Sequence, residues 1–296
     1  MDIGVKKDVG LKIFAYVVVG ILALISILPL LYVIVVSFSD SQSIKEIGYS
    51  LIPEKWSLLA YEMLIDSPTA ILRAYGVTLL ITAMGPVAGN FISSLYAYGL
   101  SRKSFLLRRY LSFFLYFTML FSGGMVPIYI LVTRYLGLRN NTLSMVLPYL
   151  VTPSYIFLMR TFIQSIPDSL FEAAKLDGAS EFRILFKIVF PISKGGIATV
   201  TLFTLLGFWN SWYPCMLYID DSKKYTLQYL LHTIMTRFQN LQLEMEAGML
   251  GGDMAALPMD SLRMATCVLA IGPLVIAFPF FQKYFVKGIA VGSVKG

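Results

Sequence analysis

The chain of 296 residues is 57% hydrophobic and only 14% charged, with a mean hydropathy of +0.73. This composition argues against a water-soluble fold, in which an apolar core needs a solvated polar shell. The formal net charge of +7 does not indicate nucleic-acid binding, because the basic residues lie in short loops between apolar segments instead of gathering on one solvated face.

Six stretches contain no Asp, Glu, Lys or Arg, and each reaches the length of about 20 residues that a helix needs to cross a bilayer. One charge at the centre of a spanning helix costs about 3 kcal/mol, so six such stretches are not expected by chance. The sequence therefore predicts an all-α, polytopic protein of the cell membrane with six transmembrane helices. The predicted spans are approximately residues 13–37, 74–100, 110–133, 141–159, 196–219 and 264–282.

The distribution of basic residues predicts the orientation. If the N-terminus is cytoplasmic, 15 of the 24 Lys and Arg residues lie in cytoplasmic segments, as the positive-inside rule requires. Both termini are then cytoplasmic, and the first apolar stretch, which lacks a signal-peptide cleavage pattern, is a retained helix. The principal segments outside the spans are the cytoplasmic loop 160–194, the extracytoplasmic loop 220–263 and the cytoplasmic tail 283–296.

Several residues within the spans predict local packing. Gly85 and Gly89 form a GxxxG step that allows close helix contact, and Cys215 and Cys267 are expected to be small apolar packing residues. Prolines in the spans predict kinked or broken helices. These are Pro29, Pro86, Pro127, Pro148, Pro153, Pro214, Pro273 and Pro279.

The loop 160–194 carries the most informative pattern. Ser169 and Glu172 have the spacing of a capping box, which predicts a helix start, and Gly178 is expected to end this short helix in the left-handed conformation. A second helix is predicted from Glu181 to Val189, stopped by Pro191. Periodicity alone is equally consistent with an amphipathic connector that rests on lipid headgroups.

The residues of this loop also resemble a known motif. Glu172-Ala173-Ala174, then Gly178 after three residues, then Ile188-Val189-Phe190-Pro191 after nine more, is similar to the EAA loop of bacterial binding-protein-dependent ABC importers. Phe190 departs from the leucine usual before the proline. The resemblance implies a type I importer permease core whose loop docks on an ATP-hydrolysing subunit. The docking residues that it implies are Glu172, Ala173, Ala174, Asp177, Gly178, Ile188 and Pro191.

The resemblance extends along most of the chain. The segments 121–129, 209–210 and 282–296 look like those of the carbohydrate permeases, in the oligosaccharide and polygalacturonan branch related to the smaller maltose permease. It implies that the loop 220–263 meets a solute-binding protein and that the tail is a second contact with the ATPase. The candidate tail residues are Lys287, Gly288, Gly292 and Lys295.

The sequence predicts no catalytic or metal site on this chain. Glycine is never followed by lysine, which excludes a Walker A loop, and His232, expected in a surface loop, is the only histidine. ATP and magnesium are therefore expected on a partner. The resemblance implies four partners besides the bilayer: a second permease subunit, an ATP-binding dimer, an extracytoplasmic solute-binding protein and an oligosaccharide.

The spans contain no ionisable cluster of the kind that ion-coupled carriers use, but they offer aromatic and uncharged polar groups suited to a sugar. The candidates for a substrate pathway are Trp209, Asn210, Trp212 and Tyr213, although aromatic residues near span ends are also ordinary interfacial anchors. The sequence thus predicts an importer permease for oligosaccharides. Two alternatives remain, the same architecture for a non-sugar solute and a non-transporting membrane scaffold or sensor.

Overall fold

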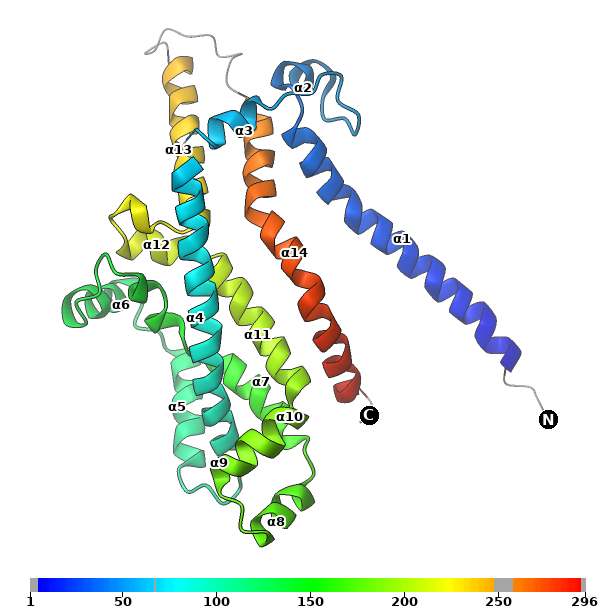
Figure 1. The fold of residues 1–296 in the computed structure, drawn as a ribbon, viewed down its shortest axis with the longest axis vertical. Helices are drawn as coiled ribbons and strands as arrows, with labels where there is room; N and C mark the ends of the chain where they lie inside the picture. The colour runs from blue at the N-terminus through cyan, green and yellow to red at the C-terminus, as the bar shows by residue number, and fades with distance from the viewer. Residues whose placement is uncertain (1–4, 67, 248–257, 294–296) are drawn as a thin grey trace. The chain divides into compact units, whose positions relative to one another are not determined.

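A computed structural model describes residues 5–66, 68–247 and 258–293 (Figure 1). All regular elements in these ranges are helical, and the other backbone pairing there is an isolated antiparallel bridge between Ser39 and Trp56. The predicted all-α class is confirmed.

Three long helices correspond to the first, second and sixth predicted spans. They are α1 (Val5–Ser37), α4 (Pro68–Ser101) and α14 (Met259–Ser293). The parts long and apolar enough to cross a membrane are Gly10–Ser37, all of α4 and Met259–Pro279. Every side chain from Gly10 to Tyr32 is exposed within the chain, so the apolar surface of α1 needs lipid or another subunit to cover it.

The other three predicted spans coincide with bent pairs of helices. With these pairs counted as single spans, the number of candidate spans rises from three to six. The first pair is α5 (Arg108–Leu120) with α6 (Met125–Ile130) and the π-helix η1 (Leu131–Tyr135), bent by 113°. The second is the 3-10 helices η2 (Thr142–Met145) and η3 (Leu147–Tyr149) with α7 (Pro153–Gln164), bent by 52°. The third is α9 (Glu181–Ile184), the π-helix η4 (Leu185–Val189) and α10 (Phe190–Ile192) with α11 (Lys194–Trp209), bent by 81°.

Glycine and proline account for where the helices stop. The break after α5 falls on Phe121-Ser122-Gly123-Gly124, and Gly124 has the positive φ of +84° that glycine adopts readily. Pro153 lies in the first turn of α7, where its missing N–H breaks no helical bond. By contrast, α1 runs through Pro29 and α4 through Pro86, so broken helices are wrong there. One lost hydrogen bond does not end a helix of more than 30 residues.

The remaining elements are short or lie outside the spans. His232 is exposed, but it lies on a helix instead of the expected loop, because the apolar pattern of the surrounding segment continues for 20 residues. These elements are α2 (Ser41–Ile47), α3 (Leu59–Leu64), α8 (Asp168–Leu176), α12 (Tyr213–Tyr218), η5 (Ser222–Lys224) and α13 (Leu227–Glu246).

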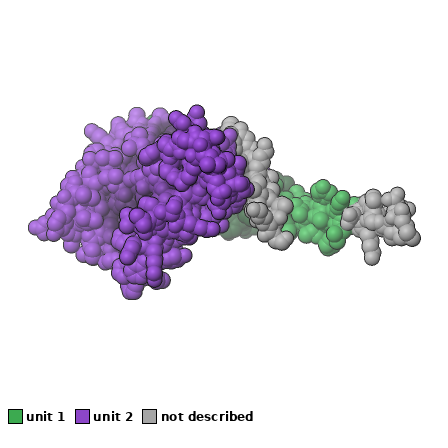
Figure 2. Space-filling model, turned by 90° about the horizontal axis from the view of Figure 1, so that it is seen from below, with its two compact units in different colours: residues 1–68, 233–273 green, residues 69–232, 274–296 purple. Residues whose placement is uncertain are grey.

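The chain divides into two compact units, which Figure 2 distinguishes by colour. Unit 1 comprises residues 1–68 and 233–273, and in it α3 packs against the first turns of α14. Ala60 and Leu64 contact Leu262 and Ala265, and the Ser261 hydroxyl donates a 2.6 Å hydrogen bond to the carbonyl oxygen of Ser39. These contacts hold the chain after α1 against the start of α14.

Unit 2 comprises residues 69–232 and 274–296 and contains the larger apolar core. The Gly85 and Gly89 step is confirmed as a contact seam: a Cβ on Gly85 would overlap the Phe208 ring, and one on Gly89 would overlap the Leu150 carbonyl oxygen. Cys215 is buried in a second cluster with Phe208, as expected, whereas Cys267 is exposed on a face of α14 that the described residues do not cover.

Candidate functional site

The candidate site is the EAA loop, residues 160–194, which begins in α7 and includes α8, α9, η4 and α10. The turn after α8 is a complete Schellman motif: the N–H of Gly178 donates to the Lys175 carbonyl at 3.0 Å, and that of Ala179 donates to the Ala174 carbonyl at 2.9 Å. Gly178 has a φ of +72°, so the predicted left-handed helix end is confirmed. The motif fixes the direction in which the chain leaves α8.

Both other expectations for the ends of these helices are wrong. The helix start is not a capping box on Ser169: α8 begins at Asp168 after Pro167, which presets the entry angle, and no side chain caps the helix. Pro191 does not stop the second helix, which continues through η4 and α10 to Ile192. Pro191 directly follows the π-helical turn η4, and its missing N–H removes one backbone hydrogen bond, which does not end the helix there.

The predicted docking residues lie on both faces of the loop. Glu172, Ala173, Asp177 and Pro191 are exposed, whereas Ala174 is buried in the core of unit 2. Ile188 is half-buried. The four exposed residues therefore lie on an outer surface, whereas Ala174 and Ile188 pack against the rest of the chain.

Two exposed apolar side chains were missed by the sequence analysis. Leu176, the last residue of α8, is 90% exposed, and Phe182 in α9 is 67% exposed. They flank Gly178 and leave a surface that is apolar in part. Apolar spacing gave no face for either residue: Leu176 is a single apolar residue at the end of a short helix, and Phe182 belongs to an apolar stripe whose covered end the sequence does not show.

The candidate pathway residues do not form one site. Asn210 lines a pocket of 280 Å³ between α7, α11 and the 3-10 segments, but Trp209 is buried, and Trp212 and Tyr213 are outside the lining. The Tyr213 hydroxyl instead lies 2.7 Å from the sulfur of Met125, and the Trp212 ring contacts His232. The pocket is lined by Met145, Tyr149, Thr152, Tyr155, Phe203, Thr204, Gly207, Phe208, Asn210, Ser211 and Pro214.

The lining of this pocket is uncharged and combines aromatic rings with neutral polar groups. Tyr155 and Phe203 stack with their ring centres 6.1 Å apart and their planes 16° apart. The hydroxyl of Ser211 is buried and has no hydrogen-bond partner among the described residues. Asn210 donates to the Leu206 carbonyl at 2.9 Å, which leaves its amide oxygen available.

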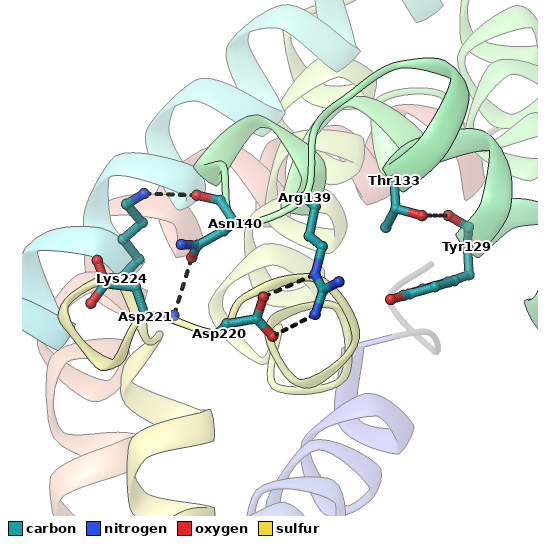
Figure 3. Close-up of polar contacts among 7 residues, drawn as sticks. All are labelled: Tyr129, Thr133, Arg139, Asn140, Asp220, Asp221 and Lys224. Carbon is teal, nitrogen blue, oxygen red and sulfur yellow. Dashed lines mark hydrogen bonds and ion pairs between the residues drawn. The ribbon is translucent and has the colours of Figure 1, made fainter.

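A polar junction joins the connection between η1 and η2 to the segment from the end of α12 to η5 (Figure 3). This Asn140 junction consists of Arg139, Asn140, Asp220, Asp221 and Lys224. Arg139 makes two hydrogen bonds to Asp220, at 2.9 and 3.4 Å. Asn140 accepts from the Asp221 N–H on its side chain and from Lys224 Nζ, at 2.7 Å, on its backbone.

Residues 287, 288 and 292 belong to α14, which continues as a helix to Ser293, so this part is not an irregular tail. Lys295 lies outside the described residues. The described residues contain no group of three or more His, Cys, Asp or Glu that could hold a metal ion.

These features define a class: an all-helical membrane protein that presents a Gly-turned pair of short helices next to its membrane core. Residues 89–291 match the family model of the inner membrane component of binding-protein-dependent transport systems. The chain belongs to this family, and it is therefore a membrane-embedded transporter permease and not a member of an enzyme family.

Similarity to individual proteins supports the same family. The chain is 38% identical to the polygalacturonan/rhamnogalacturonan transport system permease YtcP of Bacillus subtilis, over 96% of this chain and 99% of YtcP. It is 36% identical to protein LplC of the same organism, over 92% and 90%. Among solved structures it resembles a bacterial ABC transporter involved in the import of alginate, an acidic polysaccharide, with a TM-score of 0.75 and 28% identity over 96% of this chain and 100% of the other.

Proposed function

We propose that this chain is one of two transmembrane subunits of an ABC importer that carries oligosaccharides into a bacterial cell. The observation that carries the proposal is the EAA loop: a Schellman turn at Gly178 that fixes two short helices, with Leu176 and Phe182 exposed beside it. Apolar side chains held on rigid backbone suit a groove on a partner protein better than they suit water.

The partner at this loop is a cytoplasmic ATPase dimer, which binds ATP and magnesium. No Walker A sequence occurs in the chain, so the energy for transport comes from another subunit. Closure of the ATPase dimer moves the EAA loop, and the spans then open to one side or the other. The loop 160–194 and both termini lie in the cytoplasm in this proposal, and residues 287–295 form the second ATPase contact.

An oligosaccharide is the substrate class that the relatives and the pocket support. YtcP is a permease for polygalacturonan and rhamnogalacturonan, and the other relative imports alginate, so both take polysaccharides. The pocket beside Asn210 offers stacked rings and uncharged hydrogen-bonding groups, the combination that binds the faces and hydroxyls of a sugar. The solute-binding protein delivers the sugar at the other side, where the loop 220–263 meets it.

Affinity purification of the tagged chain from membranes in mild detergent tests the assembly. We expect co-elution of a Walker A protein and a second six-helix protein. Recovery of this chain alone, under conditions that keep other membrane complexes intact, would contradict the proposal.

Uptake after deletion of the gene tests the substrate class. Labelled trigalacturonate and arabinotriose are offered separately, together with a panel of amino acids and dipeptides. Loss of uptake of one of the sugars supports the proposal. Loss confined to a non-sugar solute would identify that solute, instead of an oligosaccharide, as the substrate. Unchanged uptake of every compound offered would indicate a scaffold or sensor.

A further inference from the structure

The end of α4 contacts the first helix of the EAA loop through Arg102. This residue directly follows α4, and 14% of its side chain is exposed. Its guanidinium carbon lies 3.5 Å from the centre of the Phe171 ring in α8 and 5.8 Å from that of Tyr98 in α4. Its Nη2 lies 3.6 Å from Oδ1 of Asp168, the first residue of α8. Arg102 therefore joins α4 to α8 through two rings and a carboxylate.

The last turns of α4 also contact the second helix of the loop. The buried Tyr98 donates a hydrogen bond from its hydroxyl to the Glu181 carboxylate at the start of α9. Glu181 in turn forms a 2.8 Å ion pair with Lys175 in α8. Tyr98 and Arg102, here called the anchor pair, thus contact both helices on either side of the Gly178 turn.

The chemistry of Arg102 suits a contact that must keep its geometry. A flat guanidinium lies against an aromatic face and keeps its charge when it is largely buried, whereas a lysine ammonium is a hydrated point charge on a flexible stem. Arg102 Nε is buried without a hydrogen-bond partner among the described residues. A buried N–H without a partner is unfavourable. The side chain is therefore held by its stacking on the rings and by its attraction to the Asp168 carboxylate, and not by hydrogen bonds from all of its donors.

The same helix leads to the pocket. Gly85 lies 17 residues before Arg102 in α4, about 25 Å along a helix, and its seam places the helix backbone against the Phe208 ring. Phe208 also lines the pocket beside Asn210. Packed contacts therefore run without interruption from α8 and α9, through the anchor pair and α4, to the pocket wall.

We propose that the anchor pair transmits movement of the EAA loop to α4 and so to the pocket, with Arg102 as a positioning residue for coupling. The inference rests on the proposed function, because the ATPase supplies the movement. Docking and transmission are separate steps here: Leu176 and Phe182 face the partner, and Arg102 faces the core of this chain. Loss of the anchor pair leaves the ATPase bound and active while the pocket no longer responds.

The test uses the purified complex in lipid vesicles and needs no known sugar. Asn210→Cys is introduced in a Cys215→Ser, Cys267→Ser background, and the rate of its alkylation by N-ethylmaleimide is measured with and without ATP and vanadate. We expect ATP and vanadate to change this rate in the parent complex. In Arg102→Lys the change is expected to fall by about fivefold or more, while the bound ATPase and its hydrolysis stay within about twofold.

Arg109→Lys is the matched control, because Arg109 lies in the first turn of α5, directly after the short connection that begins with Arg102, and is exposed. Tyr98→Phe removes one hydroxyl and keeps the ring, so it tests the α9 contact without a cavity, and it is expected to reduce the response less than Arg102→Lys. An unchanged response in Arg102→Lys overturns the inference, as does an equal loss in Arg109→Lys. Loss of ATPase binding in Arg102→Lys would make Arg102 a docking residue and also overturn it. A parent complex without ATPase would instead contradict the proposed function.

Discussion

The EAA loop and the Asn140 junction each hold a sharp turn of the backbone in place, but they do so with different contacts. Each turns the backbone with a residue of positive φ, Gly178 at +72° and Asn140 at +57°, and at each an arginine faces an aspartate. At the EAA loop this arginine is Arg102, which follows α4 and is largely buried against the Phe171 ring. In the junction, Arg139 and Asp220 are each 62% exposed.

This difference indicates which contacts hold each region. At the junction, the Asn140 N–H donates to the Tyr218 carbonyl at 2.8 Å, and the Asn140 side chain and carbonyl accept two further bonds. The exposed ion pair adds little to such a network, because water and salt screen it. The EAA loop depends on buried contacts on one side and leaves its other side free for a partner.

The largest effect is expected for Gly178→Val. A β-branched residue at a φ of +72° is strained by about 1–3 kcal/mol, and relief of the strain would change the angle between α8 and α9. We expect loss of ATPase co-purification. Gly76→Val in α4 is the control, since Gly76 lacks a positive φ and has no atom within 4 Å of an added Cβ. Gly178→Asn should retain most binding, because asparagine tolerates this conformation. Normal co-purification of Gly178→Val would show that the turn is not needed.

A smaller loss is expected for Leu176→Asp. If this 90% exposed side chain enters a groove of the ATPase, a charge there weakens binding by about thirtyfold or more, the range of interface hot spots. Leu243→Asp replaces a leucine of α13 that is 61% exposed, in the segment that the proposed topology puts on the side away from the ATPase, and it should not affect ATPase binding. The binding constant of the ATPase for the detergent-solubilised chain measures both. Equal binding by both variants would place the docking surface elsewhere on the chain.

Asn140 variants separate backbone conformation from hydrogen bonding at the junction. Asn140→Ala loses the bond from the Asp221 N–H and strains the positive φ, so we expect about 1–2 kcal/mol of destabilisation. Asn140→Gly loses the same bond but has no strain, and it should be less destabilised. Thermal unfolding in detergent compares the two. If glycine is as destabilising as alanine, the side-chain bond dominates instead of the conformation.

The sequence predicted those features that depend on local composition. Charge-free length gave the six helical segments, and Asp177-Gly178 gave the end of α8. Pro127 predicted a kinked or broken helix in the third span, but the position and the 113° angle of the break after α5 were not predicted, because the run of apolar residues continues across Gly123-Gly124 and hydropathy does not register a change of direction. Periodicity also did not show that Leu176 and Phe182 are exposed, since it reports only that a stripe exists and not which end of it the core covers.

Contacts distant in sequence could not be predicted from it. Arg102 looked like one of several topology-setting charges in a short connection, and only the fold brings it to Phe171, 69 residues later. The same holds for the pocket, where Asn210 was a candidate but Tyr155 and Phe203 come together from two helices. A motif identifies the surface that a partner uses, and the residues that hold this surface in place come from the tertiary structure.

The smallest effect is expected for Arg139→Gln, which removes the exposed ion pair and leaves the bonds of Asn140 intact. The hydrogen bond to Asp220 raises the pKa of Arg139 above its ordinary value, so the arginine keeps its charge, and any stabilisation from it, throughout the neutral and moderately alkaline range. Unfolding of the variant between pH 7 and 9 should therefore match that of the parent at 150 mM salt, and a difference should emerge only at low salt. A loss equal to that of Asn140→Ala at high salt would mean that the exposed pair holds the junction, and the contrast with the buried Arg102 would fail.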